Sequence, residues 1–314
     1  MWLRQFRAVV GNAVKVTMGD PFCLVLHLSG ILLMCLLGVI PGFAAGEHLK
    51  LLRDQCLALI FMLGSLGFVF GFICVVTDDI RRGAGSILVS RPIGGVCLVA
   101  GKWCGVFATV MLLHVSFLVA YLWTSEIAWD AEFLNLVSLA FYLGAIVLAM
   151  GVAGLRHYLF GGSYAIVANI TLLILLATIF TVRLLLNGLA EFDWSGIQSG
   201  IMLALGFIAF SAFLLPVAMF ADAAIVLSVG VTLFFFGLMS NYLISLVALP
   251  AQLQSIVQSL LPNWQIFWVA DRLGAGADVP IGYYVSSGIH ALLLLVVALI
   301  VGAIGFERME LKSV

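Results

Sequence analysis

Residues with reactive side chains in this sequence do not fall at the spacings that a nucleotide site requires. A phosphate-binding loop needs G-x-x-x-x-G-K-[ST], in which backbone amides hold the phosphates and the hydroxyl binds magnesium. The nearest stretch, Gly95 to Trp103, has five residues between its glycines and a tryptophan in place of the hydroxyl. The sequence therefore predicts that any ATP that drives this protein is bound by another polypeptide.

Neither a hydrolase nor a metal centre is predicted. Gly161-Gly162-Ser163 lacks the second glycine of the G-x-S-x-G nucleophile turn, because position 165 is Ala165. The histidines show no H-E-x-x-H or comparable ligand spacing. They are His27, His48, His114, His157 and His290. We therefore expect no catalytic residue, no cofactor and no metal, and we do not expect an enzyme.

Polar side chains inside long apolar runs are more informative, because hydrocarbon penalises them unless they face protein or water. These residues are His27, His114, Asn169, Arg183, Asp222, Asn241 and His290. His114 and Asn169 lie near the middles of their runs, and they are our candidates for the lining of a substrate pathway. The alternative, which we favour, is that each makes a hydrogen bond between helices.

One polar segment, residues 78–102, separates two long apolar runs and reads DDIRRGAGSILVSRPIGGVCLVAGK. Part of it has helical spacing, with the apolar residues on one face and Asp79 and Arg82 pointing elsewhere. That apolar face consists of Ile80, Ile87 and Leu88. Because proline disfavours the helical conformation of the residue before it, Pro92 predicts a helix end near Arg91.

A short amphipathic helix at the membrane edge can transmit a movement of another protein to the membrane helices on either side of it. The alternative is a connecting loop that its positive charge keeps in the cytosol. The residues by themselves leave both interpretations open.

The same segment resembles the stretch after the second membrane helix of ABC-2 type transporter permeases. The matching residues are Asp79, Gly83, Leu88, Ser90-Arg91-Pro92-Ile93 and Gly101-Lys102. The chain departs from the family pattern at Ala84, where threonine is common, and at Gly94-Gly95, which replace a basic residue. The sequence Phe306 to Leu311 also resembles the tail that follows the last helix of these permeases.

The resemblance implies that residues 78–97 form a cytosolic coupling segment that docks on a separate ATP-binding subunit. The residues that it assigns to this contact are Asp79, Arg82, Gly83, Leu88, Ser90, Arg91 and Pro92. It also implies a second permease subunit, identical or related, and an export function. The rival interpretation is a secondary transporter driven by an ion gradient, although the sequence lacks intramembrane acid pairs; a membrane-embedded enzyme is a weaker third.

Composition places the chain in the membrane. It is 64% hydrophobic and only 9% charged, whereas soluble domains carry about 25% charged residues. The apolar runs are too continuous for barrel strands, so we predict an all-α polytopic bundle in a single domain, residues 1–314. No basic stripe with interleaved aromatic residues suggests nucleic acid, and lipid is the expected surrounding.

Eight apolar runs approach or exceed the roughly 20 residues that a bilayer core requires. They cover residues 22–42, 55–76, 98–123, 134–155, 163–185, 201–220, 224–247 and 286–306. Six spans are the alternative, since many ABC-2 permeases have six; a turn at Asp222 would separate the sixth and seventh of our eight. With both termini in the cytoplasm, ten of the fourteen basic residues lie inside, which favours a multi-pass protein of the inner (cell) membrane in this orientation.

Two further segments are amphipathic. In residues 1–20, the basic residues Arg4, Arg7 and Lys15 share one side, which predicts an interfacial helix; a plain basic flank is the alternative. Residues 248–284 are predicted to be extracytoplasmic and to contain an amphipathic helix, followed by aromatic residues that anchor to headgroups or, less favoured, a gate. Those aromatic residues are Trp264, Phe267 and Trp268.

Small residues and cysteines complete the pattern. Gly64, Gly67 and Gly71 predict close helix packing, either within the subunit or at a dimer seam. The six cysteines lack CxxC spacing and are expected to be reduced side chains in or beside apolar runs.

Overall fold

A computed structural model of the chain describes residues 2–40, 48–77, 94–128, 134–187, 193–247 and 250–312. All regular structure in these ranges is helical. The predicted contact residues of the coupling segment lie outside the described residues. They are Asp79, Arg82, Gly83, Leu88, Ser90, Arg91 and Pro92.

Within these ranges, eight helices are long and apolar enough to cross a membrane, so the chain is a multi-pass membrane protein. They are α2 (Pro21–Val39), α3 (His48–Phe72) with the π-helix η1 (Ile73–Thr77), α6 (Gly95–Ile127), α7 (Leu136–Phe160), α8 (Tyr164–Asn187), α9 (Trp194–Phe220), α10 (Ala223–Ser245) and α13 (Ile281–Lys312). The prediction of eight spans rather than six is confirmed, and Ala221 and Asp222 separate α9 from α10. Asp222 caps α10, where its carboxylate accepts a hydrogen bond from the Ile225 amide.

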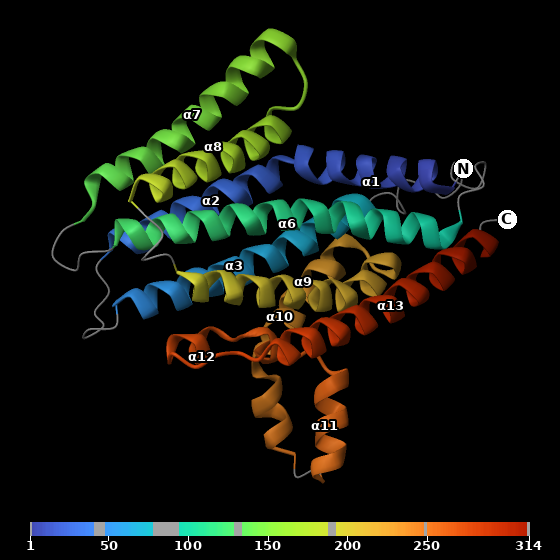
Figure 1. Ribbon diagram of the computed structural model, residues 1–314. Coiled ribbons are helices and arrows are strands. Elements are labelled where there is room, and N and C mark those ends of the chain that lie inside the picture. The colour runs from blue at the N-terminus through green and yellow to red at the C-terminus, as the bar shows by residue number, and fades with distance from the viewer. Residues whose placement is uncertain are drawn as a thin grey trace.

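Three helices form the centre of the bundle. α3, α6 and α9 each bury more than 60% of their most apolar stretch within the chain, whereas α10 buries 22%. Figure 1 shows α2 and α13 beside this centre, the α7–α8 hairpin splayed to one side and the end of α10 projecting from the other. The start of α1 (Trp2–Gly19) and the end of α13 lie at one end of the bundle, which we call the termini end.

Glycines on α3 permit the close packing of this centre. A Cβ atom on Gly64 would lie 2.2 Å from the Phe207 ring of α9, and one on Gly71 would lie 2.6 Å from Val106 of α6. A Cβ on Gly67 would lie 3.3 Å from Val110. The predicted close packing is confirmed and takes place within the subunit.

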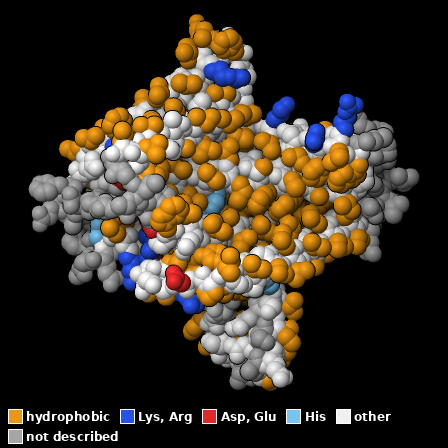
Figure 2. Space-filling model, in the orientation of Figure 1, with side chains coloured by type: hydrophobic (Ala, Val, Ile, Leu, Met, Phe, Trp, Pro, Cys, Tyr) orange, Lys and Arg blue, Asp and Glu red, His pale blue; other side chains and the backbone are white. Residues whose placement is uncertain are grey.

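The first helix packs lengthwise on α6. Cβ atoms on Gly101 and Gly105 would lie within 3 Å of Val9 and Ala13, so the two helices run in the same direction side by side. The predicted basic residues Arg4, Arg7 and Lys15 are exposed, and Figure 2 shows Lys and Arg side chains gathered along α1 above a face that is otherwise largely hydrophobic. That α1 lies in the membrane interface stays a prediction.

The segment before α13 enters the bundle. It contains the amphipathic helix α11 (Ala251–Leu260), the 3-10 turn η2 (Trp264–Phe267) and α12 (Ala270–Gly274). Trp264 and Phe267 are only 3% and 2% exposed, and the Trp264 ring packs on Phe61 of α3 and Phe210 of α9. The expectation that these two rings anchor to headgroups is therefore wrong, because the turn carries them between α3, α9 and α10.

Candidate functional site

Four residues at the termini end join the two helices that flank the segment 78–93, η1 before it and α6 after it. Val75 and Thr77 belong to η1, immediately before that segment, and Lys102 and Trp103 belong to α6, shortly after it. We call this group the α3–α6 clamp. The clamp flanks the site that the sequence analysis assigned to coupling, whose contact residues lie outside the described residues.

The first contact of the clamp joins α6 to η1, which is a π-helix. A π-helix shifts backbone hydrogen bonds to i+5, and it occurs mostly as a single turn within an α-helix, frequently at functional sites. The Lys102 amino group donates a hydrogen bond of 2.8 Å to the Val75 carbonyl. Lys102 is 7% exposed, although the sequence pattern had grouped it with the cytosolic basic residues. This hydrogen bond joins the end of η1 to α6.

Both helices of the clamp, η1 and α6, are also bonded to α9. The Thr77 hydroxyl donates to the Ala218 carbonyl at 3.2 Å, and the Trp103 indole donates to the Ser211 hydroxyl at 2.9 Å. Pro216 lies between these two α9 positions, and proline removes one backbone hydrogen bond from a helix interior. Thr77 is therefore bonded to α9 after its proline, and Trp103 is bonded to α9 before it.

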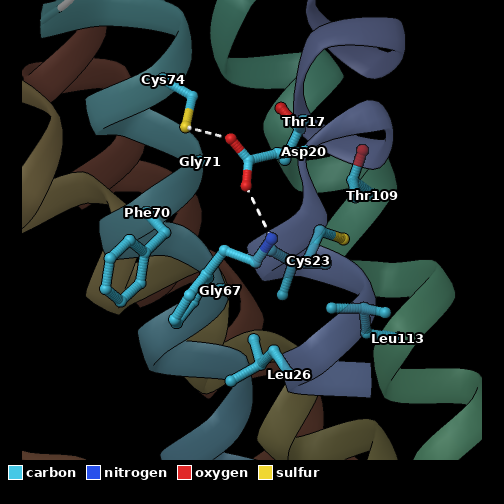
Figure 3. A pocket seen from close by; sticks show the side chains of 12 residues that line it. Thr17, Asp20, Cys23, Leu26, Gly67, Phe70, Gly71, Cys74, Thr109 and Leu113 are labelled. Atoms are coloured by element: carbon cyan, nitrogen blue, oxygen red, sulfur yellow. Dashed lines mark hydrogen bonds between the residues drawn. The ribbon is translucent and has the colours of Figure 1, made fainter. Parts of the chain in front are cut away.

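A small cavity lies beside Cys74 of η1, at the junction of α1 and α2 (Figure 3). Its volume is about 20 Å³, enough for one water molecule. The Asp20 carboxylate caps α2 by accepting from the Phe22 amide at 2.7 Å, and it accepts from the Cys74 thiol of η1 at 3.5 Å. Thr17 and Thr109 line the same cavity. The junction of the first two helices is thus tied to η1.

Asn169, one of the two predicted pathway residues, belongs to a buried network. Its Oδ1 accepts from His27 Nδ1 at 2.9 Å, and its Nδ2 donates to the Met18 carbonyl at 3.3 Å. Because Asn169 occupies Nδ1 of His27 with an acceptor, His27 Nε2 carries the lone pair and accepts from the Ser116 hydroxyl at 2.7 Å. The network links α2, α6 and α8.

The order serine, histidine and amide matches the hydrogen-bond order of a nucleophilic triad. His27, Ser116 and Asn169 are, however, each 0% exposed, and the cavity beside η1 is lined by none of them. The network therefore holds helices together, which is the alternative that the sequence analysis favoured for Asn169. The position of His27 in an apolar run identified it as a polar residue of interest. Its hydrogen bonds to Ser116 and Asn169, which are 89 and 142 residues away, could not be predicted from the sequence.

His114, the other predicted pathway residue, also bonds between helices. Its Nε2 donates to the Gly200 carbonyl of α9 at 3.0 Å, and its ring packs edge-on against Phe207. Nδ1 makes no hydrogen bond within the described residues. The structure does not bring His114 into the network of Asn169.

The end opposite the termini carries a second polar group that the sequence analysis did not predict. The Asp193 carboxylate caps α9 and accepts from the hydroxyls of Tyr121 and Ser195 and, at 3.0 Å, from the Gly196 amide. Arg53 donates to the Ser195 hydroxyl at 3.1 Å. Nearby, Arg183 and Glu126 form an ion pair of 3.2 Å.

The pKa of Asp193 lies below its ordinary value of 3.8. Burial alone would raise it, but the hydrogen bonds from Ser195, Tyr121 and the Gly196 amide favour the carboxylate and outweigh burial. A lowered pKa in the folded state stabilises the fold above the ordinary pKa, and this stabilisation is lost as the pH falls through the folded value.

Asp193→Asn is therefore expected to lower the stability of the purified protein at pH 7. Hydrogen bonds to a charged group contribute about 2 kcal/mol, and asparagine retains the helix cap. We expect the difference in melting temperature between the two proteins to shrink as the pH is lowered from 5 to 3. A difference that stays constant over this range would show that the charge of Asp193 does not stabilise the fold.

Within the described residues, no group of three His, Cys, Asp or Glu side chains lies close enough to hold a metal ion. No protein-family model, curated protein or solved structure matches the chain. What the protein does must therefore be inferred from its own residues.

Proposed function

We propose that this chain is the permease subunit of an ATP-driven export system of the ABC-2 type. It would pair with a second permease subunit, identical or related, and with a separate ATP-binding subunit that docks on residues 78–97. The protein would lie in the inner (cell) membrane with the termini end in the cytoplasm. The motif from Asp79 to Lys102 suggests this assignment, and eight membrane-spanning helices are compatible with it.

The observation that carries the proposal is that hydrogen bonds tie η1 and α6, the helices on either side of the segment 78–93, to each other and to the core. Lys102 bonds to the Val75 carbonyl, and Thr77 and Trp103 bond to α9. A plain connecting loop needs no such fixation, since its ends have only to leave the membrane. A segment that transmits force needs it, because a push on a loosely held loop would be absorbed by the loop itself.

The mechanism follows from these contacts. Closure of the ATP-binding subunits on nucleotide would press on the segment 78–93. The bond between Lys102 and Val75 would transmit this force to α6 and α3 together. The bonds of Thr77 and Trp103 would transmit it to α9. The bond from Cys74 to Asp20 would pass it to the junction of α1 and α2. The central helices would then move as a unit and switch access to the pathway.

A secondary transporter driven by an ion gradient is the alternative. The observation that favours it is Asp20, whose carboxylate lies beside a water-sized cavity between α3, α6 and the α1–α2 junction. An acid at such a position is a candidate for binding a proton or a cation. Such a transporter would need no nucleotide-hydrolysing partner, so the experiment below distinguishes the two.

Charge reversal tests the docking segment. The variants Arg82→Glu and Arg91→Glu are each expected to abolish co-purification of a nucleotide-hydrolysing partner, because they place like charges where the resemblance predicts a docking contact. Affinity purification from the native cells, followed by an ATP hydrolysis assay of the eluate, measures the effect. Arg156→Glu, which reverses an exposed charge at the end of α7, is the matched control.

Basic residues also set the orientation of membrane proteins, so the orientation of each variant must be confirmed with a reagent that cannot cross the membrane. Variants that keep the orientation of the unmodified chain and still bind the partner would show that Arg82 and Arg91 are not part of the contact. Absence of any nucleotide-hydrolysing partner from the unmodified complex would favour the ion-driven alternative.

A further inference from the structure

A second cavity lies between α3, α9 and α10. Its volume is about 190 Å³, larger than an engineered protein cavity of about 150 Å³ that binds benzene. Its lining consists of aliphatic and aromatic residues, a glycine and one serine. The residues used below are Met62, Ser65, Phe210, Val231 and Phe234.

The cavity runs from the surface of the bundle to its core. Met62 and Val231 at its mouth are 37% and 39% exposed, whereas Phe210 at its inner wall is fully buried. Since α3 and α10 both cross the membrane, the mouth between them faces the hydrocarbon of the bilayer. A molecule dissolved in the membrane can therefore enter sideways, without passing through water.

Ser65 is the feature that distinguishes this cavity from a gap filled by a lipid chain. Its side chain is 2% exposed and its hydroxyl makes no hydrogen bond within the described residues. Hydroxyls on membrane helices ordinarily bond to the carbonyl four residues earlier, as Ser228 and Thr232 do on α10. An unpaired hydroxyl in an apolar wall is available to an oxygen atom of a ligand.

The lining also excludes a charged ligand. Among the residues that the structure describes, no Asp, Glu, Lys, Arg or His side chain lines the cavity, and an ionised group brought to this depth would lack a partner. The hydrogen-bonding group of the ligand must therefore be neutral, such as a hydroxyl.

We propose that this cavity binds an amphiphile of the fatty-alcohol class, a hydrocarbon chain with a neutral oxygen that hydrogen-bonds to Ser65. The chain of the ligand packs between Phe210 and Phe234, and the bilayer supplies the route of entry. This site does not depend on an ATP-binding partner, so its test is independent of the test of the proposed function.

The test is photolabelling of the purified full chain in phosphatidylcholine vesicles. One probe is n-octanol carrying a diazirine, and its matched control is the same probe without the hydroxyl. We expect octanol to label peptides with residues 62–69 and 230–235 about threefold or more above the alkane, the difference that one hydrogen bond contributes. Ser65→Ala should reduce octanol labelling to the alkane level. Equal labelling of the unmodified chain by both probes would overturn the role of Ser65.

Blocking the mouth provides an independent arm. Val231→Trp should abolish labelling by both probes, whereas Val297→Trp should leave it unchanged, because Val297 is an exposed valine of α13 away from the cavity. Both variants must elute from gel filtration like the unmodified chain. Labelling of the same peptides that survives Val231→Trp would show that the probe binds elsewhere.

The bilayer's own chains are the competing occupant. A third probe, phosphatidylcholine with the diazirine in one acyl chain, is used at the same mole fraction as the octanol probe. We expect it to label the cavity peptides more weakly than octanol does, because its ester oxygens stay at the interface. Stronger labelling by the phospholipid would show that an ordinary acyl chain fills the cavity, and it would overturn the proposal.

Discussion

Lys102→Met is expected to disconnect the partner ATPase from the membrane helices while leaving the fold intact. The variant keeps the length of the side chain and its packing in α6, but it removes the hydrogen bond to the Val75 carbonyl. The change removes one hydrogen bond from that carbonyl, whereas removing a buried amino group relieves its desolvation. These effects oppose each other, so we expect the melting temperature to change by only a few degrees.

The effect on coupling should be much larger. Couplings between distant sites correspond to about 1–3 kcal/mol, so the loss of this link should reduce stimulation of the partner's ATP hydrolysis about tenfold. The measurement compares the ATPase activity of the complex containing Lys102→Met with that of the unmodified complex. Lys15→Met is the matched control, because Lys15 is exposed on α1. Full stimulation in Lys102→Met would show that the clamp does not transmit force.

His27→Leu is expected to lower the stability of the protein by about 2 kcal/mol, because the buried Ser116 hydroxyl and the buried Oδ1 atom of Asn169 each lose their hydrogen bond to His27. Asn169→Leu should have a similar effect. Since both variants break the same bond, the double variant should cost less than the sum of the two single changes. Thermal unfolding in detergent measures all three proteins.

This cycle also decides between the two roles considered for Asn169. In membrane proteins, side-chain hydrogen bonds average about 0.6 kcal/mol in such cycles, so a coupling of that size or more supports a structural network. Additive effects of the two changes would show that His27 and Asn169 act separately. Unchanged stability in both single variants would return Asn169 to the lining of a substrate pathway.

Hydropathy was sufficient to predict the helical fold, because each span is a continuous apolar run that must satisfy its own backbone hydrogen bonds in lipid. It also separated α9 from α10, since the run is too long for one crossing and Asp222 is a good helix cap. The glycines of α3 were identified for the same kind of local reason: a residue without a Cβ permits contacts such as that of Gly64 with Phe207.

Features that depend on contacts distant in sequence were not predicted. Trp264 follows an amphipathic helix, so its position suggested an anchor at the membrane surface; only the path of the turn between α3, α9 and α10 buries it. Lys102 was grouped with the cytosolic basic residues, because no local sequence pattern predicts its hydrogen bond to the Val75 carbonyl, 27 residues earlier. The predicted contact residues from Asp79 to Pro92 lie outside the described residues.

The most direct test of the proposed role is a photo-crosslinking residue at Leu88, on the predicted apolar face of the coupling segment. In the native cells, it should give a crosslinked product that contains this chain and a second polypeptide able to hydrolyse ATP. We expect this product to disappear when Arg91 is changed to glutamate. A residue at position 88 that instead reacts with a membrane-impermeant reagent from outside the cell, and that crosslinks to no ATP-hydrolysing protein, would contradict the account.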